Sequence, residues 1–273
     1  MSTSTVLVIG ATGKQGGATA YALLNRGFHV RALTRNVRSP AASRLSDKGI
    51  QVVKGDLSDQ SSLISALKGV SAAYFMTDSS IGIEGEIAQA TNFIAALQEA
   101  EVGRVVYSSA HSADRTASIG GVPHWDSKLD IEKRLKASGL KWTILRPVSF
   151  MENVPLDGVA RYMALGAFSA ALGGPNVKMQ VVSADDVGFV AAKVIAEHEV
   201  FMGQTVDIVG DEISVADMQR AFESVVGHRV TRASMPRWFV LMMFPYVQPV
   251  IRLTFGGANL ITCEGTSLRS FSR

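Results

Sequence analysis

The 273-residue chain has the composition of a globular protein with a sizeable core, because 47% of its residues are hydrophobic and 19% are charged. The formal net charge of +3 is small and the basic residues are spread along the chain, so we expect no nucleic-acid partner. The single cysteine, Cys263, excludes an internal disulfide and a metal site built on several thiolates. The five histidines show no close ligand spacing, so we expect no metal.

The N-terminus and the most apolar stretch bear on the protein's location. The chain runs into a strand pattern without a charged and apolar leader, and together with the single cysteine this favours a cytoplasmic protein. The apolar run from Trp238 to Phe244 is shorter than the ~20 residues that span a bilayer, so we expect no membrane span. For residues 238–251, a buried helix, a pocket wall and a subunit contact, as in a homodimer, stay open.

Short apolar runs alternate with helical patterns along the first half of the chain. We predict strands at residues 6–9, 28–33, 52–53, 72–76, 104–107 and 142–145. We predict helices at residues 18–26, 84–100 and 126–138. This order predicts an α/β fold with a Rossmann-type, doubly wound parallel sheet. After residue 150 the pattern loosens, so we predict one domain at 1–150 and a smaller α/β lobe at 151–273, packed on it.

Three glycines, Gly10, Gly13 and Gly16, stand between the first predicted strand and the first predicted helix. Glycines there permit a tight turn and a close approach to a pyrophosphate, while the helix N-terminus offers free N–H groups. A glycine-rich turn without a ligand is the alternative, but the flanking strand and helix favour a dinucleotide. The predicted loop contacts are Gly10, Ala11, Thr12, Gly13, Lys14, Gln15 and Gly16. Lys14 either reaches a phosphate or is solvated.

The end of the second predicted strand decides between NAD(H) and NADP(H). An NAD site usually places an Asp or Glu there, on the ribose 2′-hydroxyl, but residues 30–38 contain no carboxylate. Arg35 stands where a guanidinium can bind a 2′-phosphate, and Arg38 can assist. Two solvated loop arginines are the alternative. The missing acid and the arginine together predict NADP(H) in preference to NAD(H), bound to residues 1–150.

Asp56 and Leu57 follow the third predicted strand and fit a contact to the adenine ring. The carboxylate can accept a hydrogen bond from the exocyclic amine while the leucine packs on the ring. The alternative is that Asp56, or Ser58 in its place, caps the next helix.

Together these pieces resemble the NmrA-like family of atypical short-chain dehydrogenases/reductases, especially its NADP(H) redox-sensor branch. The matching pieces are Gly10 to Gly17, Thr34-Arg35-Asn36, Gly55-Asp56-Leu57, His124-Trp125-Asp126-Ser127-Lys128, Arg146-Pro147 and Phe150-Met151-Glu152-Asn153. The resemblance includes Asn36 among the cofactor contacts. It implies that Thr77 faces the cofactor, that Lys128 binds the nicotinamide ribose, and that Phe150, Glu152 and Asn153 lie at the nicotinamide.

Catalytic machinery is harder to find. The wider superfamily uses Tyr-x-x-x-Lys, in which the lysine lowers the pKa of the tyrosine, but none of the five tyrosines has a lysine four places on. His124 and Lys128 have that spacing, and a histidine could replace tyrosine as the proton donor. Alternatively, Lys128 only binds ribose and His124 only packs or caps. Ser108 and Ser109 stand where a carbonyl-orienting serine is expected, or simply end a strand.

Two functions remain in competition. One is an NADPH-dependent oxidoreductase that reduces quinone-like or conjugated small molecules, for which the missing tyrosine is tolerable because the anion formed is already stabilised. The other is a non-catalytic NADP(H) redox sensor that acts through a protein partner. The sequence leans toward the oxidoreductase.

Overall fold

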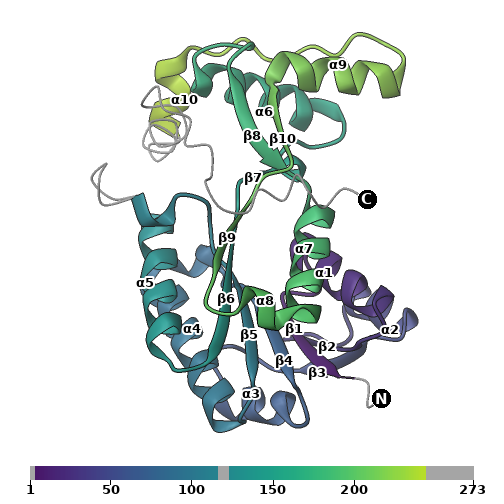
Figure 1. Cartoon of the computed structure of the whole chain (residues 1–273). Coiled ribbons are helices and arrows are strands. Elements are labelled where there is room, and N and C mark those ends of the chain that lie inside the picture. Colours follow the sequence, from purple (N-terminus) through teal and green to yellow (C-terminus); the bar gives the residue numbers. More distant parts are fainter. Residues whose placement is uncertain (1–3, 116–122, 244–273) are drawn as a thin grey trace. The chain divides into compact units, whose positions relative to one another are not determined.

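The computed structural model describes residues 4–115 and 123–243, which form two compact units, each with its own sheet (Figure 1). Residues 4–114, 123–147 and 184–208 form the first unit, and residues 148–183 and 209–243 belong to the second. The predicted single boundary after residue 150 did not anticipate the return of residues 184–208 to the first unit.

A seven-stranded parallel sheet forms the first unit, in the order β3-β2-β1-β4-β5-β6-β9. Its strands are β1 (Thr5–Ile9), β2 (His29–Thr34), β3 (Gln51–Lys54), β4 (Ala72–Phe75), β5 (Arg104–Ser108), β6 (Lys141–Pro147) and β9 (Thr205–Ile208). The strand order reverses between β1 and β4, and open α/β sheets bind ligands at the carboxyl ends of strands beside such a reversal. The predicted Rossmann-type sheet is confirmed.

Helices cover both faces of this sheet (Figure 1). They are α1 (Lys14–Asn25), α2 (Pro40–Asp47), α3 (Gln60–Leu67), α4 (Gly82–Glu99), α5 (Pro123–Ala137), α7 (Ala184–Ala196) and α8 (His198–Phe201). Helix α7 lies directly on α1, since a Cβ atom added at Gly188 would lie 2.5 Å from the carbonyl carbon of Ala18. On the other face α4 packs between α3 and α5. Burial on both faces explains why the strands read as continuous apolar runs.

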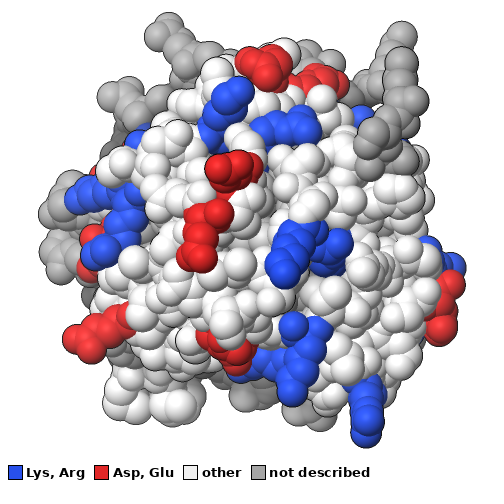
Figure 2. Space-filling model, turned by 90° about the horizontal axis from the view of Figure 1, so that it is seen from below, with Lys and Arg blue, Asp and Glu red and all other residues white. Residues whose placement is uncertain are grey.

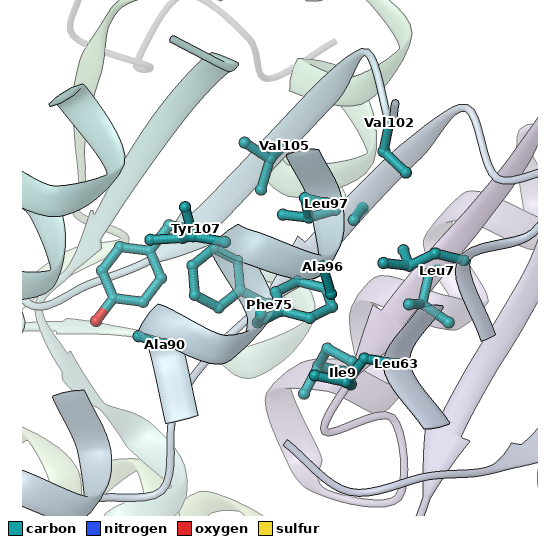
Figure 3. Packing of buried hydrophobic residues seen from close by; sticks show 14 of the residues in the cluster. Leu7, Ile9, Leu63, Phe75, Ala90, Ala96, Leu97, Val102, Val105 and Tyr107 are labelled. Atoms are coloured by element: carbon teal, nitrogen blue, oxygen red, sulfur yellow. The ribbon is translucent and has the colours of Figure 1, made fainter. Parts of the chain in front are cut away.

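The main core lies between the sheet and α3, α4 and α5 (Figure 3). The Phe75 ring centroid lies 4.6 Å from that of Tyr107 and 5.1 Å from that of Phe93. Side chains such as Leu7, Leu63 and Leu97 are fully buried there, and each such burial contributes roughly 1.5–3 kcal/mol. This packing fixes the strand ends that carry the polar residues considered below.

The second unit contains a three-stranded sheet in the order β10-β8-β7. Its elements are β7 (Ser149–Phe150), α6 (Gly158–Leu172), β8 (Lys178–Val182), β10 (Asp211–Ser214), α9 (Val215–Val226) and α10 (Arg237–Met243). Helix α9 begins with a reciprocal capping box between Ser214 and Asp217.

The apolar segment that begins at Trp238 is not a buried helix as far as the structure describes it. In α10 only Val240 is buried, while Trp238 is 67% and Met242 63% exposed. Residues 244–251 of the segment lie outside the described residues. No helix among the described residues has the length and apolar character needed to cross a membrane. On the face drawn in Figure 2, basic and acidic side chains are interspersed.

Candidate functional site

A pocket of about 630 Å³ lies at the carboxyl ends of β1, β2, β3 and β4. Its walls bring together most of the predicted loop and strand-end residues, namely Gly10, Thr12, Gly13, Lys14, Gln15, Gly16, Arg35, Asn36, Asp56, Leu57 and Thr77. Ala11 and Arg38 stand next to wall residues in the chain but do not line the pocket. The same walls include residues that the sequence did not single out, namely Ser39, Met76, Asp78, Ser79 and Gln89.

The glycine loop is held in a tight turn by its own backbone. Gly10 has φ +76°, which favours glycine, and its carbonyl accepts a hydrogen bond of 2.9 Å from the N–H of Gly13. A Cβ atom at Gly16 would lie 2.3 Å from the Gly10 oxygen, so the helix could not approach the loop this closely with any other residue. Two of the three glycines are therefore required by the loop itself.

Gly13 is different, because the protein alone places little demand on it. Its φ of −95° is open to any residue, and a Cβ atom there would meet only the Gly10 oxygen, at 3.4 Å. A side chain at this position would instead occupy the pocket wall, which is where a phosphate must approach the backbone. Gly13 thus fits a bound pyrophosphate better than it fits an empty turn.

The N-terminus of α1 also fits an anion. Its N-cap residue, Gly13, provides no side-chain hydrogen bond, and its first turn holds no acidic residue. By contrast, Ser39 caps α2 and Asp59 caps α3, each by accepting from a backbone N–H at 3.2 Å. The first N–H groups of an α-helix have no partner within the helix, and together with the helix dipole they attract a phosphate.

Two of the predicted loop residues turn toward the sheet. Ala11 is buried, and the buried Gln15 side chain donates from Nε2 to the Tyr74 hydroxyl at 2.7 Å and to the Ser108 hydroxyl. Burial raises the pKa of Tyr74 to about 12, so this hydroxyl keeps its proton at neutral pH. The Nε2 atom of Gln15 thus ties α1 to β4 and β5.

The end of β2 presents Arg35 to the pocket without a neighbouring acid on that strand. Arg35 is exposed, and Asn36 beside it accepts a hydrogen bond of 3.0 Å from the backbone N–H of Arg38. Asp78, which follows β4, also lines the pocket. Hydrogen bonds from Ser80 hold the pKa of Asp78 below its usual range, and the charge of Arg35 adds to the effect. The pocket wall thus places a cation at the strand end where a 2′-phosphate would have to bind.

Asp56 does not cap the following helix, and neither does Ser58. Asp59 is the cap of α3, whereas Asp56 Oδ1 accepts from the N–H of Ser58 at 2.8 Å within the loop. The capping alternative for Asp56 is therefore wrong.

Gln89 of α4 lines the same pocket, and its buried Oε1 has no hydrogen-bond partner among the residues that the structure describes. An acceptor left unpaired beside a pocket suits a ligand that carries a donor.

Thr77, just after β4, connects the pocket to a buried polar network. Its hydroxyl donates to Oε1 of Glu86 on α4 at 2.7 Å and accepts from Nζ of Lys128 on α5 at 3.0 Å. Lys128 Nζ also lies 2.7 Å from Glu86 Oε1, and Ser127 donates to Glu86 Oε2 at 2.5 Å. Lys128 does not itself line the pocket, but it is one hydrogen bond away from it through Thr77.

Glu86 remains ionised in this network although it is only 1% exposed. Burial alone would raise the pKa of Glu86, but the Lys128 charge and the hydrogen bonds from Lys128, Ser127 and Thr77 outweigh burial and lower that pKa. The sequence carried a signal for this residue. Glu86 stands on the same face of α4 as the buried Ala90, Phe93 and Leu97, and a carboxylate within an apolar stripe needs a buried partner.

A second buried network lies at the ends of β5 and β6. Arg146 donates from Nε and Nη2 to the two oxygens of Glu132, at 2.9 and 2.7 Å, and Ser109 donates to Glu132 Oε1 at 2.6 Å. Ser108 accepts from Gln15, as described above. Both serines therefore take part in internal contacts, which favours the alternative that they serve the strand end and not a substrate carbonyl.

The remaining predicted contacts cannot be tested by this geometry. The His124 side chain lies outside the described residues, so its proposed pairing with Lys128 stays a prediction. Phe150 ends β7, and Glu152 and Asn153 form the short 3-10 helix Met151–Asn153. All three belong to the second unit, and their contact with the nicotinamide stays a prediction as well.

Comparison with known proteins assigns the chain to a family. The family model described as the NmrA-like family matches residues 2–254. The chain belongs to the NmrA-like family. The resemblance that the sequence motifs suggested is thereby confirmed. Among curated relatives, quinone oxidoreductase 2 of Escherichia coli strain K12 is 31% identical over 209 residues, which cover 76% of this chain and 68% of that protein.

Solved structures of other proteins share the fold. The triphenylmethane reductase of Citrobacter sp., complexed with NADP(H), gives a TM-score of 0.74 at 22% identity and covers 91% of this chain and 90% of its own. The negative transcriptional regulator NmrA, in complex with NADP, gives a TM-score of 0.74 at 19% identity and covers 94% and 92%. At these identities the likeness establishes the fold alone, and that fold is shared by an enzyme and a regulator.

Proposed function

We propose that this NmrA-like protein binds NADP(H) in the pocket at the ends of β1 to β4 and reduces quinone-like or conjugated small molecules. The observation that carries the proposal is the glycine loop, where Gly13 has no internal need to be glycine and the N-terminus of α1 lacks a side-chain cap. Kinship with a quinone oxidoreductase supports the reaction class. The single cysteine suits a reducing cytoplasm, where we expect the protein to work.

Each part of the cofactor is assigned to residues of this chain. The N–H groups at the start of α1 hold the pyrophosphate, and Arg35, with Asn36 and Arg38, holds the 2′-phosphate. Asp56 and Leu57 contact the adenine. Thr77 and Lys128 hold the nicotinamide ribose. At the nicotinamide itself the proposed contacts are Phe150, Glu152 and Asn153.

The reduced nicotinamide, when bound, supplies the hydride. The residues of this chain bind it, orient it and exclude water. Because Ser108 and Ser109 take part in internal hydrogen bonds, His124 is the proton donor that we retain among the residues singled out from the sequence. A quinone-like acceptor needs little help from an acid, since the anion that it forms is stabilised by conjugation.

A non-catalytic redox sensor is the second candidate. It is favoured by the absence of Tyr-x-x-x-Lys from the sequence and by the fold that the chain shares with the NADP-bound regulator NmrA. A sensor would bind the dinucleotide with the same residues and pass its occupancy to a protein partner.

Steady-state oxidation of NADPH over a panel of quinones and dyes separates the two candidates. We expect saturable oxidation with at least one acceptor in the wild-type protein and none in Gly13→Val. His124→Ala is expected to lower turnover by roughly 10²–10⁴-fold with little change in NADPH affinity if the histidine donates a proton. Tight NADPH binding without turnover on any acceptor would contradict the reductase and leave the sensor.

A further inference from the structure

The hydrogen-bond donors and acceptors that remain open in the Glu86 network determine which groups it can bind. The Thr77 hydroxyl gives its one proton to Glu86 Oε1 and accepts from Lys128. Lys128 carries three N–H donors, of which one is directed to Glu86 at 2.7 Å and one to Thr77 at 3.0 Å. One donor of Lys128 is left without a partner among the described residues. The remaining lone pair of Thr77 faces the buried hydroxyl of Tyr107, which has no other partner there.

We propose that Glu86 is a positioning residue that adapts Thr77 and Lys128 to a neutral hydroxyl group. The inference rests on the proposed function, in which that hydroxyl belongs to the nicotinamide ribose. A hydroxyl can accept from the remaining Lys128 donor and donate to an oxygen of the Thr77–Tyr107 hydroxyl pair at the same time. A phosphate or a carboxylate offers acceptors alone and could use only the donor side of this arrangement.

The charge of Glu86 supports the same selection. Lys128 is 5% and Glu86 1% exposed, so their charges compensate each other in a poorly solvated place. An unpaired lysine there would attract any anion, including a second phosphate group. With Glu86 in contact, Lys128 serves as an oriented donor and not as a net positive charge. Ser127 fixes the other carboxylate oxygen, which limits rotation of Glu86.

Glu86→Gln tests this role, because it keeps the shape of the side chain and removes its charge. We would measure the affinity of each variant for NADPH and for adenosine 2′,5′-bisphosphate, a fragment that lacks the nicotinamide ribose. Glu86→Gln is expected to lower the affinity for NADPH by about tenfold and to leave the affinity for the fragment unchanged. In a Lys128→Met background the same substitution should have no further effect on NADPH.

The chain offers a matched control in Glu132, which is equally buried and whose ion-pair partners Arg146 and Lys136 do not line the pocket. Glu132→Gln should lower the melting temperature and leave both affinities unchanged. If Glu86→Gln does not fold, Ser127→Ala, which removes the hydrogen bond to Glu86 Oε2, should weaken the binding of NADPH by about twofold to threefold with no change for the fragment.

Three results would overturn the role of Glu86, each in a different way. Unchanged NADPH affinity in the folded Glu86 or Ser127 variant would refute it directly. An equal loss for NADPH and for the fragment would reduce Glu86 to a purely structural residue. Failure of the wild-type protein to bind NADPH at all would remove the proposed function, and the wild-type titration identifies that case before any variant is made.

Discussion

The carboxyl edge of the seven-stranded sheet has two halves that use polar residues in opposite ways. At the ends of β1 to β4, backbone N–H groups, Arg35 and Thr77 face a pocket. At the ends of β5, β6 and β9, the charged groups pair with one another, as in the Arg146–Glu132 pair and the contact of 2.9 Å between His111 Nδ1 and Asp207 Oδ1. Buried charge alone therefore does not mark the site. Polar groups that lie beside a cavity and lack a hydrogen-bond partner mark the site better.

The largest expected effect falls on the open half of the edge. Gly13→Val should abolish NADPH binding, by more than about 100-fold, because a branched side chain would fill the space needed by the pyrophosphate. The melting temperature should stay close to wild type, since φ of −95° at this position suits any residue. Calorimetric titration and thermal unfolding of the same sample check both statements. Normal binding by the folded variant would show that the loop does not hold phosphate.

Gly16→Ala provides the counterpart within the same loop. Its Cβ atom would lie 2.3 Å from the Gly10 oxygen, so the loop itself must shift. This variant should lose thermal stability as well as binding. The pair of glycine variants thus separates a ligand requirement from a folding requirement.

The closed half should respond in stability and not in binding. Glu132→Gln removes the charge that pairs with two nitrogens of the buried Arg146 and leaves Asp114, 3.0 Å from Nη1, as the remaining acidic partner. We expect this to cost about 1.5–3 kcal/mol in the free energy of unfolding. Denaturant unfolding measures this loss, and NADPH titration of the folded variant should give the wild-type affinity. A clear loss of NADPH affinity would mean that the two halves are coupled, and the distinction between them would fail.

An effect of similar size is expected at the adenosine end of the open half. Arg35→Ala should weaken the binding of NADP(H) by roughly 1.5–3 kcal/mol, because it removes a charged partner of the 2′-phosphate. NADH carries no such phosphate, so its affinity should hardly change. Titration with both cofactors makes the comparison. Equal losses for the two would refute the assignment of Arg35.

The smallest expected effect is on how the free energy of unfolding changes with pH. Burial works against the Glu86 charge, but Lys128 and the surrounding hydrogen bonds lower the pKa of Glu86 in the folded protein. A lowered folded pKa gives stability that is complete above the unfolded value, ~4.3 for glutamate, and is lost as pH falls through the folded pKa. The difference in unfolding free energy between wild type and Glu86→Gln should shrink as pH falls below that value. A difference independent of pH would mean that Glu86 is not ionised.

Local signals made much of the fold and part of the site predictable. The glycine loop and the end of β2 are continuous segments in which the residue types and their spacing are enough to indicate a role, and both line the pocket. The starts of helices were harder, since α1 begins at Lys14 and not at Ala18 and the short helices α2 and α3 were missed. Their apolar periodicity is too brief to register over eight residues each.

The contacts made across the fold could not be predicted in this way. Gln15 stands in the loop motif, yet its amide group bonds to Tyr74 and Ser108, which lie far along the chain. Glu86 and Gln89 come to the pocket region only because α4 packs beside β4, and sequence order alone does not give that neighbourhood. A carboxylate on the apolar face of α4 was the available signal, and the partner it requires became visible only in the structure.

The central claim is that the open half of this edge binds NADP(H), and a calorimetric titration of the wild-type protein with NADPH and with NADH tests it most directly. The account predicts saturable binding at one site per chain, with NADPH the tighter ligand because Arg35 faces its 2′-phosphate. The absence of saturable binding to either cofactor would contradict the account at its base, and tighter binding of NADH would contradict the cofactor preference.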